Sequence, residues 1–202
     1  MLTRKALFAL ALCAATPLAA ADYSDPTWPC IQRKVERLSE GLMWPHPIPE
    51  TMPEDPALRR EIEQLAAKLA IRRIEVPDLQ ADVTAFAERN GGDPALLGLV
   101  FEETFASLNG RRSRIIGGIG DFSLSQISLS ERIEAARQEM DTEMALDDPD
   151  FDKVDALEEQ LDWDQTIYTD RQQSITYLCE TPVLLEKRLY AISQLLQGVV
   201  SG

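Results

Sequence analysis

Apolar residues recur at alternating intervals of four and three along two long stretches in the second half of the chain. In residues 101–140, ten of twelve such positions are apolar, and in residues 154–199 eleven of fourteen are apolar. This spacing places one apolar stripe along a helix and is typical of helices that pack as in a coiled coil. The pattern therefore predicts two long amphipathic helices.

A short polar segment, residues 145–150 with the sequence ALDDPD, separates the two stretches. Two long helices joined by a short turn lie antiparallel beside each other. The sequence therefore predicts an all-α fold built on a long antiparallel, coiled-coil-like helical hairpin, with arms at residues 94–145 and 150–200. Helices of about 50 residues would make this hairpin roughly 75 Å long.

Several glycines interrupt the first arm. Gly110, Gly117, Gly118 and Gly120 each cost about 1 kcal/mol inside a helix, but none occupies the apolar stripe. We expect the helix to continue, straight or bent, through Gly117 and Gly118; the alternative is a break into two stacked helices. Ser107, Gly110 and Gly117 would also let another helix approach closely.

Shorter helical patterns precede the hairpin, and we expect these helices to pack against it. They cover residues 30–40, 56–73 and 77–89. Gly41 follows the first pattern where a helix C-cap is expected, and a glycine pair follows Asn90 after the third. Their inward-facing positions are Ile31, Val35 and Leu38, then Leu58, Ile62, Leu65 and Leu69, and finally Leu79, Val83 and Phe86.

Residues 41–56 contain five prolines and cannot form a helix. Such a segment either wraps over the folded body or serves as a docking motif for a partner with an aromatic groove. Met43 and Trp44 favour the wrap, because both side chains need burial.

Residues 1–21 have the features of a secretory signal peptide. Arg4 and Lys5 precede an apolar run, ALFALALCAA, and three alanines end the segment at Ala21, where we expect cleavage. The run is too short for a membrane span, which needs roughly 20 apolar residues. The sequence thus divides into this leader, an N-terminal arm at residues 22–55 and a helical domain at residues 56–202. We expect a protein of the periplasm or the extracellular space, without a transmembrane segment.

Two cysteines follow the leader, Cys30 and Cys179. In an oxidising compartment such a pair is expected to form a disulfide, here between residues 149 positions apart. Two separate buried thiols are the alternative. The spacing is not that of a redox-active Cys-x-x-Cys motif.

Composition excludes several classes of function. The formal net charge of -14 argues against general nucleic-acid binding. The chain has a single histidine, His46, which lies between Pro45 and Pro47 and is a poor candidate for a catalytic base. We identify no catalytic residues from the sequence.

Polar residues occupy some stripe positions. If the two arms pair so that residue numbers sum to about 294, Gln126 lies beside Tyr168, between Asp164 and Arg171. Such a polar layer fixes helix register, or it brings a carboxylate, a guanidinium and a phenol together in a site. The register role is the preferred interpretation.

The same pairing sets Arg112 opposite Pro182. A proline inside a helix leaves the carbonyl four residues earlier, that of Leu178, without its helical donor. We therefore expect Arg112 to donate to this kinked segment.

The turn between the arms carries the clearest local motif. Counted from Asp148, the carboxylates Asp148, Asp150, Asp152 and Glu159 fall at positions 1, 3, 5 and 12 of a calcium-binding loop. Lys153 stands where such a loop needs glycine. The alternative is an acidic first helical turn, with Asp148 as its cap.

These observations favour a non-enzymatic interaction protein, an accessory or chaperone-like partner of a protein complex in the cell envelope. A divalent-cation-binding module at residues 148–159 and a carboxylate-dependent cell-envelope enzyme are the alternatives. We expect no cofactor except, under the first alternative, calcium. Heptad helices can pair within one chain or between two copies, so a homo-oligomer is compatible with the pattern.

Overall fold

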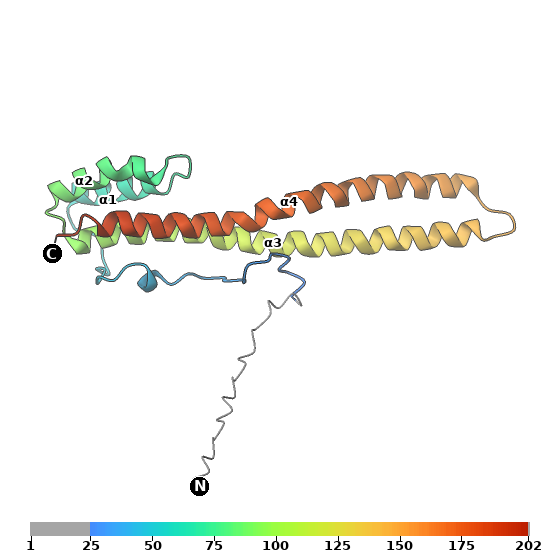
Figure 1. The fold of residues 1–202 in the computed structure, drawn as a ribbon, viewed down its shortest axis with the longest axis horizontal. Coiled ribbons are helices and arrows are strands. Elements are labelled where there is room, and N and C mark those ends of the chain that lie inside the picture. The colour runs from blue at the N-terminus through green and yellow to red at the C-terminus, as the bar shows by residue number, and fades with distance from the viewer. Residues whose placement is uncertain (1–24, 202) are drawn as a thin grey trace, which may run out of the picture.

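The protein is an all-helical molecule dominated by one long hairpin, as Figure 1 shows for the computed structural model, which describes residues 25–201. The hairpin consists of α3 (Pro94–Met144) and α4 (Phe151–Gln197). No strand occurs among residues 25–201. The predicted all-α fold and antiparallel hairpin are confirmed, with both arms within a few residues of the expected bounds. The predicted leader lies outside the described residues.

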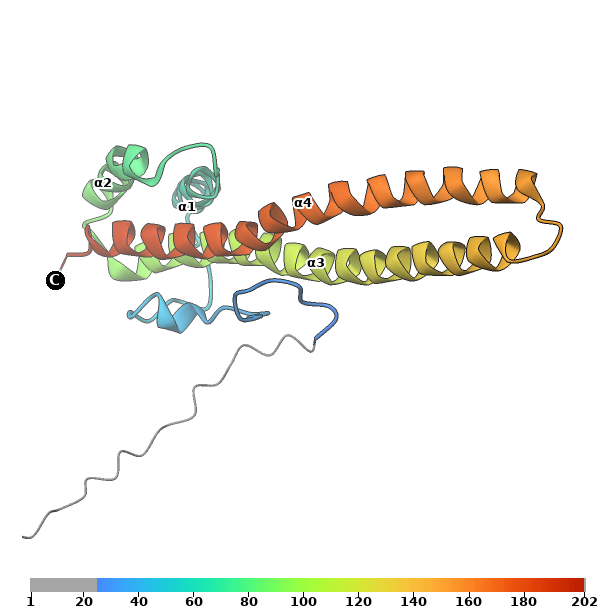
Figure 2. The ribbon, with the colours of Figure 1, turned by 45° about the vertical axis from the view of Figure 1, so that its right-hand side comes forward.

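Shorter elements surround only one end of the hairpin. The helices α1 (Pro56–Leu69) and α2 (Gln80–Arg89) pack on one side of it, near the C-terminus (Figures 1 and 2). The N-terminal arm runs along the opposite side and carries one short 3-10 turn, η1 (Glu40–Leu42). A second 3-10 turn, η2 (Val76–Leu79), leads into α2. The turn end of the hairpin projects beyond all of these elements.

Aspartates begin three of the helices in the same way. The Asp55 and Asp93 side chains each accept a hydrogen bond of 2.8 Å from a backbone N–H in the first turn of α1 and α3, where a proline stands at the first position. Proline suits this position because its missing N–H would be unpaired there. Asp150 caps α4 by accepting from Lys153 N at 3.2 Å. Local sequence therefore fixes where α1, α3 and α4 start.

Three separate apolar clusters line the hairpin from base to tip. The largest lies at the base, where α1 and α2 bury their predicted inward faces against α3 and α4. A second cluster surrounds the disulfide, with Trp28, Cys30, Ile116, Ile119 and Cys179. The third holds the tip together through Leu129, Ile133, Ala136, Leu157 and Leu161. The base is thus a packed domain, whereas the tip is a two-helix coiled coil.

The helix α3 is continuous through Gly117 and Gly118, as expected. Among residues 25–201, no helix comes close to Gly110 or Gly117. A Cβ atom at Gly117 would have no neighbour within 4 Å, and one at Gly110 would meet only Arg114 Nη1 at 3.8 Å. The N-terminal arm comes near the helix at other glycines, since a Cβ at Gly120 would lie 3.5 Å from Thr27 Cβ.

The predicted helix at residues 30–40 is absent, and this part of the arm is extended up to η1. Within this part, Ser113 Oγ of α3 donates to Glu36 O at 3.4 Å, and hairpin hydroxyls bond two carbonyls on either side of it. Ser123 Oγ donates to Pro26 O at 2.6 Å, and Ser193 Oγ donates to Met43 O at 2.6 Å. Ile31, expected to face inward, is 81% exposed. Tertiary contacts therefore override the weak helical pattern.

The proline-rich segment wraps over the base of the hairpin. Trp44 is 3% exposed and stacks on Phe101 with ring centroids 5.5 Å apart. A Cβ atom at Gly98 would lie 3.0 Å from Trp44 Nε1, so the arm and α3 approach closely here. The wrap, rather than a free docking motif, is therefore the correct interpretation around Trp44.

No helix within the described residues is both long and apolar enough to cross a bilayer.

Candidate binding groove on the distal hairpin

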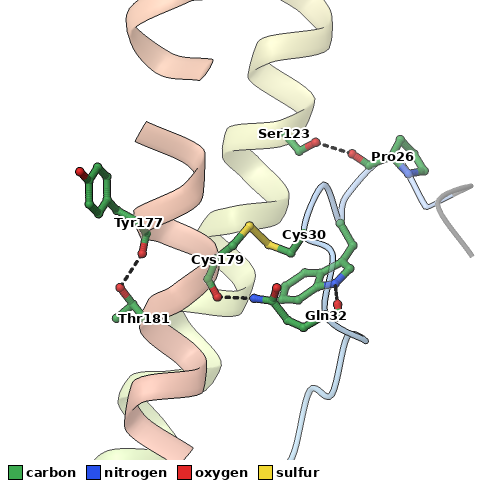
Figure 3. Close-up of a disulfide and its surroundings, with 8 residues drawn as sticks. Pro26, Cys30, Gln32, Ser123, Tyr177, Cys179 and Thr181 are labelled. Carbon is green, nitrogen blue, oxygen red and sulfur yellow. Dashed lines mark hydrogen bonds between the residues drawn. A yellow bond between two sulfur atoms is a disulfide. The ribbon is translucent and has the colours of Figure 1, made fainter. Parts of the chain in front are cut away.

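The disulfide between Cys30 and Cys179 is present, with Cα atoms 5.5 Å apart (Figure 3). It joins the arm to the middle of α4. The Gln32 side-chain amide donates to the carbonyl oxygen of Cys179, and Trp28 Nε1 donates to Gln32 O at 2.6 Å. The alternative of two separate thiols is thereby excluded, and the arm is anchored covalently and by hydrogen bonds at one point.

The polar layer confirms the predicted register of the hairpin. Gln126 Nε2 donates to the backbone oxygen of Tyr168 at 3.3 Å, as the residue sum of 294 requires. Gln126 is buried, and its other side-chain atom, Oε1, finds no hydrogen-bond donor among residues 25–201. A glutamine bonded to the facing backbone tolerates little sliding of the helices, which supports the register role.

The other members of the layer do not converge on a site. Asp164 pairs with Arg132, which donates to its two carboxylate oxygens at 2.7 and 2.6 Å. Arg171 instead donates to Ser125 Oγ at 3.1 Å, and the Tyr168 hydroxyl accepts from Gln172 at 2.9 Å. The structure therefore does not bring the carboxylate of Asp164, the guanidinium of Arg171 and the phenol of Tyr168 together in one site.

Arg132 is the partner that sequence reasoning missed. Its residue number and that of Asp164 sum to 296, close to the 294 of the predicted pairing. Arg132 therefore lies beside the apolar stripe of α3 and reaches Asp164 on α4. These hydrogen bonds lower the pKa of the Asp164 carboxyl below its ordinary value. The sequence could have indicated this pair, because in the predicted register Arg132 lies beside the apolar stripe and nearly opposite the stripe residue Asp164.

Arg112 does not donate to the kinked segment of α4, contrary to the prediction. Its Nη2 lies 3.6 Å from Glu186 Oε2, while Gln32 of the arm bonds the backbone beside the kink. The Arg112 side chain is 4% exposed, and its Nε and Nη1 find no acceptor within the described residues. Burial lowers the pKa of this guanidinium, and Glu186 partly opposes that shift.

The acidic turn begins α4 as a helix. Asp150, not Asp148, is the cap, and Asp152 lies in the first helical turn. Lys153, which stands at the glycine position of a calcium loop, pairs with Glu139 and Glu143 of α3 at 3.0 Å each. In the part of the chain that the structure describes, no group of three or more histidine, cysteine, aspartate or glutamate side chains could hold a metal ion. The geometry thus does not unite Asp148, Asp150, Asp152 and Glu159.

A groove of about 680 Å³ runs along the side of the distal hairpin, which we define as residues 121–175. Nine of its thirteen lining residues belong to α3, three belong to α4, and Pro29 belongs to the arm. Its apolar lining residues are Pro29, Phe122, Ile127, Ala135 and Ile175, with Tyr168 beside them. Glu131 and Glu134 add carboxylates. We call this feature the lateral groove.

The distal hairpin is strongly acidic and carries uncovered apolar side chains. Residues 121–175 hold 16 of the 34 aspartates and glutamates but only four of the 20 lysines and arginines. Two of those four, Arg132 and Lys153, are already paired with carboxylates of the hairpin itself. The large apolar residues exposed here are Leu124, Ile127, Met144, Leu146, Phe151 and Trp163. Acidic and exposed apolar side chains therefore occupy the same part of the hairpin.

Comparisons with protein-family models, with curated proteins and with solved structures find no match to this chain.

Proposed function

We propose that this is a non-enzymatic interaction protein outside the cytoplasm, an accessory or chaperone-like partner of an envelope complex. In this proposal its lateral groove holds a basic amphipathic helix of a protein partner. The observation that carries the proposal is the union of an apolar groove with the acidic surface of the distal hairpin. The disulfide supports the extracytoplasmic setting, because such bonds persist in oxidising compartments.

The position of the groove supports binding of a partner rather than internal packing. At the base, α1, α2 and the arm already cover the hairpin. Toward the tip from Ser123, which bonds Pro26 of the arm, only the two helices of the hairpin remain among residues 25–201, and Ile127 in the groove is 41% exposed. A third helix laid along two helices buries an apolar stripe at coiled-coil spacing.

Charge selects a basic helix as the occupant. Glu131 and Glu134 line the groove, and neither takes part in an ion pair among residues 25–201. Lysines or arginines flanking the stripe of an incoming helix would meet these carboxylates, whereas an acidic helix would be repelled. Charge complementarity of this type speeds encounter and suppresses wrong partners more than it adds affinity.

Synthetic helical peptides provide the test. Two peptides share leucines at coiled-coil spacing and differ only in carrying lysine or glutamate at the polar positions. Fluorescence anisotropy should show that the lysine peptide binds and the glutamate peptide does not, with binding weakened by salt. The variant Ile127→Gln should weaken binding of the lysine peptide, because it removes apolar surface from the groove.

Leu124→Gln is the matched control. Leu124 lies on the same helix and is 48% exposed, but it does not line the groove. Equal weakening by the two variants would indicate general attraction to an acidic surface and would overturn the proposal. Photo-crosslinking from position 127 in intact cells extends the test, and the captured segment must itself be a basic amphipathic helix.

A further inference from the structure

A second cavity, of about 630 Å³, lies between the arm and α4, with Arg112 of α3 in its wall. Trp28 and Met43 line it from the arm, and Val183, Glu186 and Tyr190 line it from α4. We call this feature the Arg112 pocket. Its volume falls in the range of small-molecule sites, which are typically apolar with a few well-placed polar groups.

The buried guanidinium in this pocket lacks the partners that such a group requires. A guanidinium has five N–H donors in a planar fork and stays charged in proteins. A buried charge is costly unless it is paired and hydrogen-bonded. Arg112 Nε and Nη1 nevertheless find no acceptor among residues 25–201, although the side chain is 4% exposed.

Glu186 is an incomplete partner for Arg112. Its Oε2 lies 3.6 Å from Nη2, beyond ordinary hydrogen-bond length, and its side chain is 47% exposed. A carboxylate held so loosely can turn outward to solvent. Two further cations, Arg33 and Lys187, also line the pocket, so positive charge exceeds negative charge there.

The missing partner is an anion with two coplanar oxygens, because such an anion matches the guanidinium fork. The walls are mainly apolar, which favours an organic body over a strongly hydrated inorganic ion. The indole of Trp28 lines the pocket and is held in place by its hydrogen bond to the arm backbone at 2.6 Å.

We propose that the Arg112 pocket binds a small organic carboxylate, with the carboxylate on Arg112 and the apolar body against Trp28 and Val183. This site is separate from the lateral groove and does not depend on the proposed partner helix. The ligand displaces the Glu186 carboxylate from the guanidinium when it enters.

Calorimetric titration with 4-phenylbutyrate and with the uncharged 4-phenylbutan-1-ol tests this assignment on the disulfide-bonded protein. The acid should bind about tenfold or more tightly than the alcohol, because charge-assisted hydrogen bonds contribute at least this factor. Arg112→Met should bind acid and alcohol equally, whereas Arg114→Met, an exposed arginine on the same helix, should keep the preference. Glu186→Gln should bind the acid more tightly than the unaltered protein.

Three outcomes would overturn the proposal: equal binding of acid and alcohol, a preference that survives in Arg112→Met, or no acid binding to the folded protein. Circular dichroism checks that each variant is folded. If Arg112→Met fails to fold, the Arg112 Nε–H resonance of the unaltered protein decides the matter. It must shift on addition of the acid and stay unchanged with the alcohol.

Discussion

Cys30 in the N-terminal arm and Cys179 in α4 are bonded at the point where the hairpin leaves its base, with Cα atoms 5.5 Å apart (Figure 3). Cys179 directly follows Leu178, whose carbonyl loses its helical donor at Pro182. The disulfide and the hydrogen bond from the Gln32 side-chain amide thus anchor the arm beside the turn of α4 that lacks one helical hydrogen bond.

Replacing both cysteines by serine should lower the melting temperature. The bond closes a loop across 149 residues. On the chain-entropy model this constrains the unfolded state by up to about 5 kcal/mol. Differential scanning calorimetry under oxidising conditions measures the change, with reduction of the unaltered protein as a second route to the same state. A melting temperature unaffected by either treatment would contradict this stabilising role.

The hairpin could be predicted from the sequence because its periodicity extends over many heptads. Gln126 and Tyr168 even meet at the predicted register. The arm could not be predicted, since its conformation depends on distant hydroxyls such as Ser123 and Ser193, which bond its carbonyls. A three-residue apolar pattern around Ile31 carries too little free energy to compete with those contacts.

The candidate sites were harder to predict than the fold. The sequence does not show that Arg112 Nε and Nη1 lack hydrogen-bond acceptors. This becomes visible only in the folded structure, where the guanidinium is buried. The lateral groove likewise could not be predicted, because its position depends on where the N-terminal arm, α1 and α2 stop covering the hairpin. At the acidic turn, Lys153 pairs with carboxylates of α3, and the turn sequence alone does not reveal these contacts.

Asp164→Asn should destabilise the distal hairpin by a few degrees in melting temperature. Asp164 is 4% exposed, and its two hydrogen bonds from Arg132 favour the charged carboxylate. Because the pKa of Asp164 is lowered on folding, its stabilisation is present above the ordinary pKa near 3.8 and is lost as pH falls through the folded value.

Melting curves from pH 7 down to pH 3 measure this effect. The difference between the unaltered protein and Asp164→Asn should be full at neutral pH and shrink in acid. Asp162→Asn, an exposed neighbour, serves as control and should leave the curves nearly unchanged. A difference independent of pH would show that the Arg132 pair is not its source.

Gly117→Ala and Gly98→Ala should change stability in opposite directions. A Cβ at Gly117 meets nothing within 4 Å, so alanine should stabilise the middle of α3 by roughly 0.5–1 kcal/mol. A Cβ at Gly98 would lie 3.0 Å from Trp44 Nε1 and 3.1 Å from Ile48 Cγ1, which would force the buried arm outward.

Urea titration followed by tryptophan fluorescence separates the two variants. Gly117→Ala should move the midpoint to higher urea without altering the native emission. Gly98→Ala should lower the midpoint and shift the native emission to the red as Trp44 gains water. If both alanine variants were more stable than the unaltered protein, the arm would be able to move away from Gly98 without loss of stability, and the prediction for Gly98→Ala would be wrong.

Glu40→Gln should stabilise the protein at neutral pH. Glu40 Oε1 is buried without a donor among the described residues. Burial, and then the charge of Glu102, raise the pKa of Glu40 above its ordinary value of 4.5. A carboxyl whose pKa rises on folding binds protons more tightly in the folded state, so its ionisation costs stability as pH increases through the folded value.

The melting temperature of Glu40→Gln should therefore exceed that of the unaltered protein at pH 7, and the two should converge below about pH 4.5. Glu50→Gln removes an exposed carboxylate from the same arm and should produce no such pH-dependent gain. A lower melting temperature for Glu40→Gln at pH 7 would show that the charged carboxylate is stabilising there. The buried carboxylate would then need a donor that is not among residues 25–201.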